Sequence, residues 1–168
     1  MDLKEEIRNC KLCPLYQLME TSPVPPDWSG FPEVMFIIDT NLGAINDFDQ
    51  KPITGVTHTR FMQILTSHLN DWYITPFVKC RPKSTTYTKK NMGDCSYWIK
   101  EEIKRLDPKV IVACGSRIDK IIQCDFICKT PAQITSNARS EKEFGAILAQ
   151  IKEKLNGYKP QQVCNYRF

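Results

Sequence analysis

Short apolar runs alternate with amphipathic stretches along most of the chain. Four runs are bounded by turn formers and rich in β-branched or other apolar residues: Glu33–Ile38, Trp72–Val78, Lys109–Ala113 and, more weakly, Asp125–Cys128. Runs of this length and composition are typical of strands buried on both faces of a sheet. The pattern therefore predicts four short strands.

Between these runs, apolar residues recur at the three- and four-residue spacing of a helix. The spacing is clearest over residues 61–69, 99–106 and 144–155, and it predicts one amphipathic helix in each segment. A capping box at Ser140–Glu143 predicts where the last helix begins, and Gly157 predicts where it ends.

Strands that alternate with helices indicate a parallel sheet with helices on both faces. We therefore predict an α/β fold over residues 1–168, a single-domain three-layer α/β/α arrangement with a short, mostly parallel four-stranded sheet. Such sheets bind ligands at the carboxyl ends of their strands. The working edge is accordingly expected to consist of loops 39–55, 79–91 and 129–139.

Two segments stand outside this alternation. Pro23–Pro32 holds four prolines and a glycine, which predicts an irregular surface loop leading into the first strand. Residues 159–168 follow the last helix, and this position predicts a flexible tail. Because this tail contains aromatic residues, the alternative interpretation is a docking segment for a partner protein.

Composition narrows the class of protein. The 168 residues are 42% hydrophobic and 25% charged, which is the balance of a soluble chain with one core, and we expect a monomer. No run approaches the roughly 18 apolar residues of a membrane span, and the charged N-terminus lacks the apolar stretch of a signal peptide. The chain is therefore expected in the cytoplasm, or in the host nucleus or nucleoid if it is viral, and is not expected to be secreted.

Positive charge is concentrated in one predicted loop. The net charge is only +4, but Lys79–Lys90 carries five cations and no acid. A local positive field of this kind is suited to the phosphates of nucleic acid, and a solvated surface loop is the plainer alternative. The residues expected to contact phosphates are Lys79, Arg81, Lys83, Lys89 and Lys90.

Four of the eight cysteines are candidates for a metal centre, because disulfides do not persist in a reducing compartment. Cys10 and Cys13 form a C-x2-C pair, a spacing that lets two thiolates reach one centre. Cys80 follows a predicted strand and Cys95 begins a predicted helix, so a loop can bring both to the pair. A four-thiolate zinc site and plain reduced thiols are the alternatives.

Several motifs resemble one known family. The chain reads YITPFVKCRPK from Tyr73, C-x2-W from Cys95 and PKVIVACG from Pro108. These motifs resemble the core of the iron-sulfur uracil-DNA glycosylases, whose members typically read YITNxVKCRPP, C-x2-W-L and PKxIVALG after an N-terminal C-x2-C pair. The match covers the predicted sheet, the basic loop and the cysteines.

The resemblance extends from Cys10 to about Leu155. The segments DTNLG at 39–43, PITG at 52–55 and TPAQI at 130–134 lie where the family has GExPG, PFVG and HPAxLL. The resemblance implies a protein that docks on DNA and flips a base out of the stack. It also implies a structural 4Fe-4S cluster held by Cys10, Cys13, Cys80 and Cys95.

The motifs of the family's base pocket have changed in this chain. Ile53 replaces the phenylalanine that stacks on uracil, so stacking worth roughly 1–3 kcal/mol is lost unless Phe48 replaces it. Pro76 replaces the asparagine that reads the uracil edge, and proline offers no donor. Thr130 replaces the histidine that stabilises negative charge on the base.

The first loop also departs from the family pattern. Asn41 lies where the related mismatch-specific glycosylases have an asparagine that orients the attacking water, and a turn residue is the alternative role. The candidate catalytic residues are therefore Asp39, Asn41 and Thr130. The residues expected to form the base pocket are Thr40, Gly43, Ile53 and Pro76.

These departures lead to two hypotheses about function. The first is a DNA-binding iron-sulfur protein with a degenerate base pocket, non-catalytic or weakly active, that assists a replication or transcription protein in a compact, viral genome. The alternative is an active DNA glycosylase that hydrolyses the N-glycosidic bond of uracil, a mismatched thymine or a modified base.

Overall fold

The computed structural model describes residues 2–39, 41–83 and 86–157. Within these residues, five strands form one sheet in the order β1-β3-β2-β4-β5. Strand β1 pairs with β3 in the antiparallel sense, and the other pairs are parallel. The strands are β1 (Asp27–Ser29), β2 (Val34–Ile38), β3 (Trp72–Pro76), β4 (Val110–Cys114) and β5 (Phe126–Cys128).

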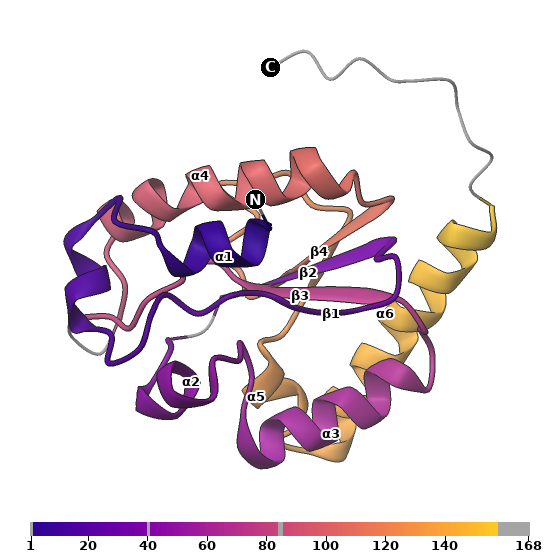
Figure 1. Ribbon diagram of the computed structural model, residues 1–168. Helices are drawn as coiled ribbons and strands as arrows, with labels where there is room; N and C mark the ends of the chain where they lie inside the picture. Colours follow the sequence, from indigo (N-terminus) through magenta and orange to yellow (C-terminus); the bar gives the residue numbers. More distant parts are fainter. Residues whose placement is uncertain (1, 40, 84–85, 158–168) are drawn as a thin grey trace.

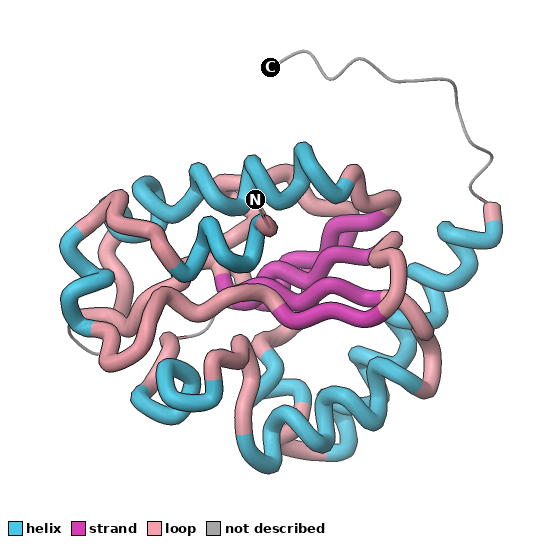
Figure 2. Tube along the Cα trace, in the orientation of Figure 1, coloured by secondary structure: helices cyan, strands magenta, loops and turns pink. Residues whose placement is uncertain are grey.

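Helices cover both faces of this sheet, which forms the middle layer (Figures 1 and 2). One face carries α4 (Lys89–Leu106), with α1 (Leu3–Arg8) beside it. The other face carries α3 (Gly55–Thr66), α5 (Pro131–Ile134) and α6 (Ala138–Asn156), and α2 (Ala44–Asp49) lies on this side too. A 3-10 helix, Pro14–Leu18, follows α1.

Successive residues of the central strand β2 enter two separate hydrophobic cores. Phe36 packs in a core with Phe61 of α3 and Phe144 of α6, and the rings of Phe61 and Phe144 stack with centroids 5.1 Å apart. Met35 packs in a second core with Ile99 of α4. Because side chains alternate along a strand, these two cores are the two faces of the sheet.

The predicted fold class is confirmed, and the sheet gains one strand that the pattern did not predict. The Pro-rich segment is not a surface loop, because Val24 is fully buried and its N–H donates to the carbonyl of Lys79 at 2.6 Å. The segment continues into β1, where Trp28 lies opposite Tyr73. Three residues are too few for an alternating pattern to register in the sequence.

The last helix begins earlier than the capping box predicts. Its N-cap is Asn137, whose side-chain oxygen accepts a hydrogen bond from the N–H of Ser140 at 2.9 Å. Asparagine is as good a cap as serine, and Ser140 is instead buried in the first turn. The predicted tail, 159–168, lies outside the described residues.

None of the helices in the described part of the chain is long and apolar enough to cross a membrane.

Candidate functional site

The four candidate cysteines come together beside the first turns of α4. Cys13, Cys80 and Cys95 are at most 9% exposed and share one apolar core, and Cys10 is half-buried. The indole Nε1 of Trp98, one turn after Cys95 on α4, donates to the sulfur of Cys10 at 3.0 Å. The structure thus brings together three segments that are remote along the chain.

The electrostatics of these thiols reflect their closeness. Burial raises the pKa of Cys80, and the neighbouring Cys95, Cys13 and Cys10 raise it further. Burial also raises the pKa of Cys95 to about 11, although the main-chain N–H and the charge of Lys79 act in the opposite direction. At neutral pH these two thiols are therefore protonated, and a metal centre that binds them as thiolates releases protons.

Four thiols are a donor set that both zinc and an iron-sulfur cluster accept. Among the described residues, no three or more His, Cys, Asp and Glu side chains form a group that could hold a metal ion. Zinc–sulfur bonds of about 2.3 Å put the sulfurs of a tetrahedral site only about 3.8 Å apart. A zinc site would need the four sulfurs at that spacing, whereas a polynuclear thiolate-bound group would hold them further apart.

A tyrosine joins the loop that carries Cys80 to the loop that follows β2. The hydroxyl of Tyr87 donates to the carbonyl of Cys80 at 2.8 Å and accepts from the N–H of Leu42 at 3.0 Å. Tyr87 is only 6% exposed, so these bonds are shielded from water. Tyr87 therefore links the main chain at Cys80 to the loop that carries Asn41.

The predicted phosphate contacts divide into two groups. Lys83, Lys89 and Lys90 are exposed, and Lys90 pairs with Asp94 at 3.2 Å. Arg81 is partly buried; its guanidinium donates to the carbonyl of Leu18 and lies 3.6 Å from carboxylate oxygens of Asp47 and Glu20. The exposed lysines remain candidates for contact with a polyanion.

The prediction that Lys79 contacts phosphates is wrong. This side chain is fully buried, and its ammonium lies 2.9 Å from both carboxylate oxygens of Glu102 on α4. A charge count along the loop cannot reveal this, because the partner carboxylate lies 23 positions further along the chain.

Asp39 is held by an arginine that the sequence did not single out. The Nε and Nη2 atoms of Arg117 donate to the two carboxylate oxygens of Asp39 at 2.8 and 2.5 Å, and this pairing raises the pKa of Arg117. Gly115 permits the approach, because a Cβ built there would lie 2.5 Å from the Cβ of Asp39. A carboxylate with a bidentate partner is poorly placed to act as a base.

A cavity of about 140 Å³ lies where the base pocket was expected, at the carboxyl end of β2. It is lined by Ile38, Asn46, Pro52, Ile53, Thr54, Thr57, Pro131 and Ala132. The structure thus brings Ile53 to the cavity. Pro76 is not among these lining residues, although it pairs with Ile38 in the sheet.

The remaining predicted pocket residues either do not line this cavity or lie outside the described residues. Asn41 and Gly43 are exposed, and Thr40 lies outside the described residues. Thr130 precedes the lining residue Pro131, but its hydroxyl and its N–H both donate to the side-chain oxygen of Gln133 at 3.1 Å. Thr130 therefore caps the short helix α5.

Phe48 does not replace the missing aromatic ring. It is 79% exposed on α2 and is not among the residues that line the cavity. Its neighbour Asn46 does line the cavity, but the amide of Asn46 is engaged with the N–H of Gly43 and the carbonyls of Lys51 and Pro52. The hydroxyls of Thr54 and Thr57 are the other polar side-chain groups of the lining.

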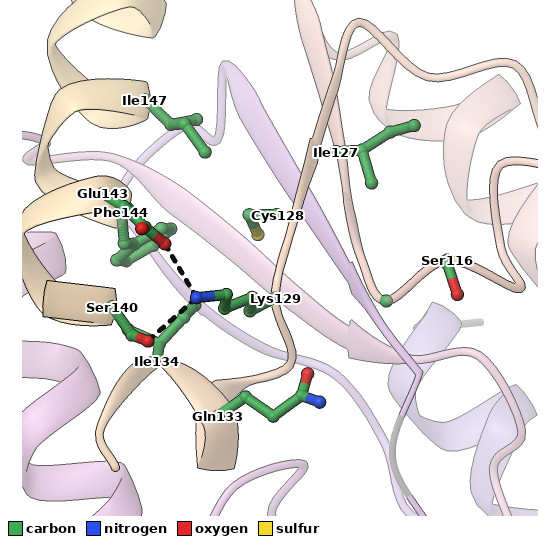
Figure 3. A pocket seen from close by; sticks show the side chains of 11 residues that line it. Ser116, Ile127, Cys128, Lys129, Gln133, Ile134, Ser140, Glu143, Phe144 and Ile147 are labelled. Carbon is green, nitrogen blue, oxygen red and sulfur yellow. Dashed lines mark hydrogen bonds and ion pairs between the residues drawn. The ribbon is translucent and has the colours of Figure 1, made fainter. Parts of the chain in front are cut away.

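A second, larger cavity of about 390 Å³ lies between β5, α5 and α6. Figure 3 shows Lys129 at its rim, where the ammonium donates to Ser140 at 3.0 Å and to Glu143 at 2.7 Å. Cys128 lies in the floor. Of the predicted site residues that the structure describes, none lines this cavity, so its size does not make it the candidate base site.

The fold and the site define a class of protein: a three-layer α/β/α domain with a cavity at the carboxyl edge of its sheet and a group of buried thiols near the first turns of α4. The model of the uracil DNA glycosylase superfamily matches residues 34–163. The chain therefore belongs to this superfamily, and the family resemblance read from the sequence is confirmed.

Curated relatives show which members of the superfamily the chain is similar to. The chain is 31% identical over 127 residues to a Type-4 uracil-DNA glycosylase of Sulfurisphaera tokodaii, covering 71% of this chain and 56% of that protein. It is 30% identical over 118 residues to a Type-4 uracil-DNA glycosylase of Saccharolobus solfataricus, covering 67% and 54%. A Type-4 enzyme of Thermotoga maritima is 27% identical over 118 residues, covering 68% and 60%. The chain thus spans little more than half the length of these relatives.

Proposed function

We propose that this chain is a DNA-binding iron-sulfur protein whose base pocket no longer supports efficient excision of uracil, and that it serves as an accessory in DNA metabolism. The observation that carries this proposal is the lining of the carboxyl-edge cavity. Among the described residues that line it, none is aromatic and none is ionisable. Binding of DNA can survive such changes, because the fold and the exposed lysines do not depend on the pocket.

At three positions where the family resemblance expects a residue that acts on the base, this chain has a side chain unsuited to that task. Stacking needs a ring, and the residue at that position is Ile53. Edge-specific hydrogen bonding needs a donor or acceptor, and Pro76 has no such side-chain group. Stabilisation of the departing base needs a positioned donor, and the Thr130 hydroxyl is already directed at Gln133.

The cysteines Cys10, Cys13, Cys80 and Cys95 would hold the 4Fe-4S cluster of the proposal. The burial of Cys13, Cys80 and Cys95 in one core and the hydrogen bond from Trp98 to Cys10 support it. When bound, the cluster supplies a cross-link between the N-terminal segment, the basic loop and α4. Zinc at the same thiols remains the rival, because it accepts the same four ligands.

Iron analysis tests this part of the proposal. The purified protein is expected to be brown, with about four irons per chain, as a 4Fe-4S cluster requires. The variant Cys80→Ala should lose iron and unfold at lower temperature, whereas Cys124→Ala, at a half-buried cysteine outside the cluster set, should keep it. Colourless protein with stoichiometric zinc contradicts the proposal.

The names of the relatives favour a second candidate, an active DNA glycosylase. Its pocket would have to recognise a base through the Thr54 and Thr57 hydroxyls, which line the cavity, and Asn41 would have to orient water. A changed set of polar groups can change specificity rather than abolish activity. A protein partner from replication or transcription would in contrast favour the accessory role.

One experiment separates the two candidates. The iron-loaded protein is incubated with duplex and single-stranded oligonucleotides that carry uracil, mismatched thymine or hydroxymethyluracil, and abasic sites are cleaved and counted. The accessory proposal expects binding without abasic sites above those of a no-enzyme control. The glycosylase is supported instead if abasic sites form with any of these bases, are lost in Asn41→Ala, and are retained in Asp49→Asn, a control at an exposed residue of α2.

A further inference from the structure

A buried ion pair joins Lys79, in the segment that carries Cys80, to Glu102 of α4. The ammonium of Lys79 and the carboxylate of Glu102 are 2.9 Å apart, and neither side chain is more than 1% exposed. The hydroxyls of Tyr73 and Thr75 donate to the same carboxylate at 3.0 and 2.8 Å. Lys79 also donates to the Thr75 hydroxyl at 2.5 Å. Both charges are therefore fully surrounded by polar partners inside the protein.

Folding alone gives little reason to keep such a pair. Taking two charges out of water costs free energy that their attraction often fails to return, and apolar side chains of the same shape frequently stabilise a protein as well or better. A buried pair is therefore weak evidence of a contribution to stability. The position of these charges calls for another explanation.

The pair is joined to two of the four cysteines. Lys79 directly precedes Cys80, and its main-chain N–H and its charge both act to lower the pKa of Cys95. Glu102 and Cys95 are both buried residues of α4, and seven positions put them on one face of the helix, two turns apart. The ion pair thus fixes the end of β3 against the same helix face that carries Cys95.

We propose that Lys79 and Glu102 are positioning residues for the thiolate centre. Glu102 fixes Lys79, and Lys79 presents a main-chain N–H and a positive charge toward the sulfur of Cys95. This inference rests on the iron-sulfur proposal above. Four thiolates gather negative charge in an apolar interior, where a fixed cation offsets it far more than one in water.

The role predicts an effect on reduction potential. Hydrogen bonds to the sulfurs and nearby charge set the potential of a cysteine-held cluster. A cation stabilises the form that has gained an electron, so the potential is raised by Lys79. An ion pair that served only to anchor α4 to the sheet would affect stability and leave the potential unchanged.

The test compares the full-length, iron-loaded protein with the double variant Lys79→Met, Glu102→Gln. This variant removes both charges and keeps the side-chain shapes, and Tyr73 and Thr75 can still donate to the new amide oxygen. At a fixed electrode potential, the ratio of reduced to oxidised cluster is expected to fall at least tenfold. That change corresponds to a shift of about 59 mV for a one-electron couple.

A matched control removes a lysine from an ion pair at the opposite edge of the sheet. Lys109 pairs with Glu33 just before β4 and β2 begin, so Lys109→Met should leave the ratio within about twofold of wild type, since exposed charge is screened. The proposal is overturned if the double variant holds as much iron as the wild type and the reduction potential of its cluster is unchanged.

A single variant keeps the inference testable if the double variant fails to fold. Lys79→Met removes the cation itself and keeps the length of the side chain, while Tyr73 and Thr75 still donate to Glu102, so the ratio of reduced to oxidised cluster should fall below that of wild type. An unchanged or higher ratio contradicts the role. Wild-type protein that contains no iron counts against the iron-sulfur proposal instead, and so the two failures are distinguishable.

Discussion

Asp47 illustrates how one polar side chain fixes the loops around the cysteine centre. Its carboxylate is fully buried and accepts hydrogen bonds from the N–H of Glu20 at 2.6 Å and from the N–H and hydroxyl of Thr21 at 3.1 and 2.6 Å. Burial acts to raise the pKa of Asp47, but these hydrogen bonds and the charge of Arg81 outweigh it and lower the pKa. The ionised form is therefore the one that the fold stabilises.

Replacing this carboxylate should make stability depend on pH in a defined way. Asp47→Asn puts an amide donor against main-chain N–H groups, and we expect it to lower the free energy of unfolding by about 1.5–3 kcal/mol at pH 7. Because the folded pKa lies below the unfolded value of about 3.9, the advantage of wild type should be complete above that pH. It should shrink as the pH falls through the folded pKa.

Urea unfolding between pH 7 and pH 3 measures this difference. Asp49→Asn, an exposed carboxylate on the same short helix, is the control and should change stability by less than about 0.5 kcal/mol at every pH. If the loss of unfolding free energy in Asp47→Asn instead grows toward low pH, the folded protein stabilises the protonated form of Asp47.

Single residues also mark the limit of prediction from this sequence. The four cysteines could be selected because spacing and motif both constrain them, and the structure brings them together. Lys79 could not be placed, because an exposed and a buried lysine look alike in a run of cations. Arg117 escaped notice for the same reason: its partner Asp39 lies 78 positions away, and no local pattern connects them.

At the scale of elements, α4 is the part on which the candidate site depends most. One buried face of this helix carries Cys95, Trp98 and Glu102, so it contributes a cysteine, a hydrogen bond to Cys10 and the partner of Lys79. Its N-cap, Thr88, accepts from the N–H of Asn91 at 3.2 Å. The position of the helix along its axis therefore fixes all three contacts together.

Two glycines are expected to respond in opposite ways to the same substitution. Gly93 is an exposed residue of α4 with open space around its Cβ position, so Gly93→Ala should stabilise the protein by about 0.5–1 kcal/mol. Gly115 follows β4 with φ of +124°, and a Cβ there would meet Asp39 at 2.5 Å. Gly115→Ala should therefore destabilise by at least about 1–3 kcal/mol.

Thermal unfolding of both variants checks this prediction. Each 1 kcal/mol should move the midpoint by about 2–8 °C, depending on the size of the cooperative unit. Stabilisation by Gly115→Ala would show that the close approach of Asp39 to Gly115 is not held in solution.

Elements were predictable where they were long. The helices around 61–69, 99–106 and 144–155 were found because two or more turns repeat the apolar spacing. The short elements α1, α2 and α5 were missed, since each has six residues or fewer and is stabilised by packing and caps rather than by its own pattern. The cavity is bordered by two of these short helices, α2 and α5, which is why its shape could not be read from the sequence.

At the scale of the whole molecule, positive charge is less concentrated than the sequence suggested. Two of the five predicted phosphate contacts, Lys79 and Arg81, are engaged inside the protein, which leaves Lys83, Lys89 and Lys90. We therefore expect DNA binding with a modest dependence on salt. Each phosphate contact on duplex DNA adds about 0.9 to the slope of log affinity against log salt concentration.

The triple variant Lys83→Ala, Lys89→Ala, Lys90→Ala tests this surface. If all three lysines contact phosphates, the slope should fall by about 2.7 units, as measured by anisotropy of a labelled duplex over a salt series. Lys142→Ala, Lys152→Ala, at two exposed positions of α6, is the matched control and should leave the slope unchanged. An equal fall in both would indicate only a general effect of net charge.

The N-terminal segment packs against parts of the chain that are made much later. Val24 bonds to Lys79, β1 pairs with β3, and Cys10 meets Trp98 of α4. A ribosome releases this segment first, so it has no docking partner until α4 has left the exit tunnel. Any inorganic group shared by these cysteines must accordingly be inserted late in translation or after it, and until then the nascent thiol pair is open to oxidants and to competing metals.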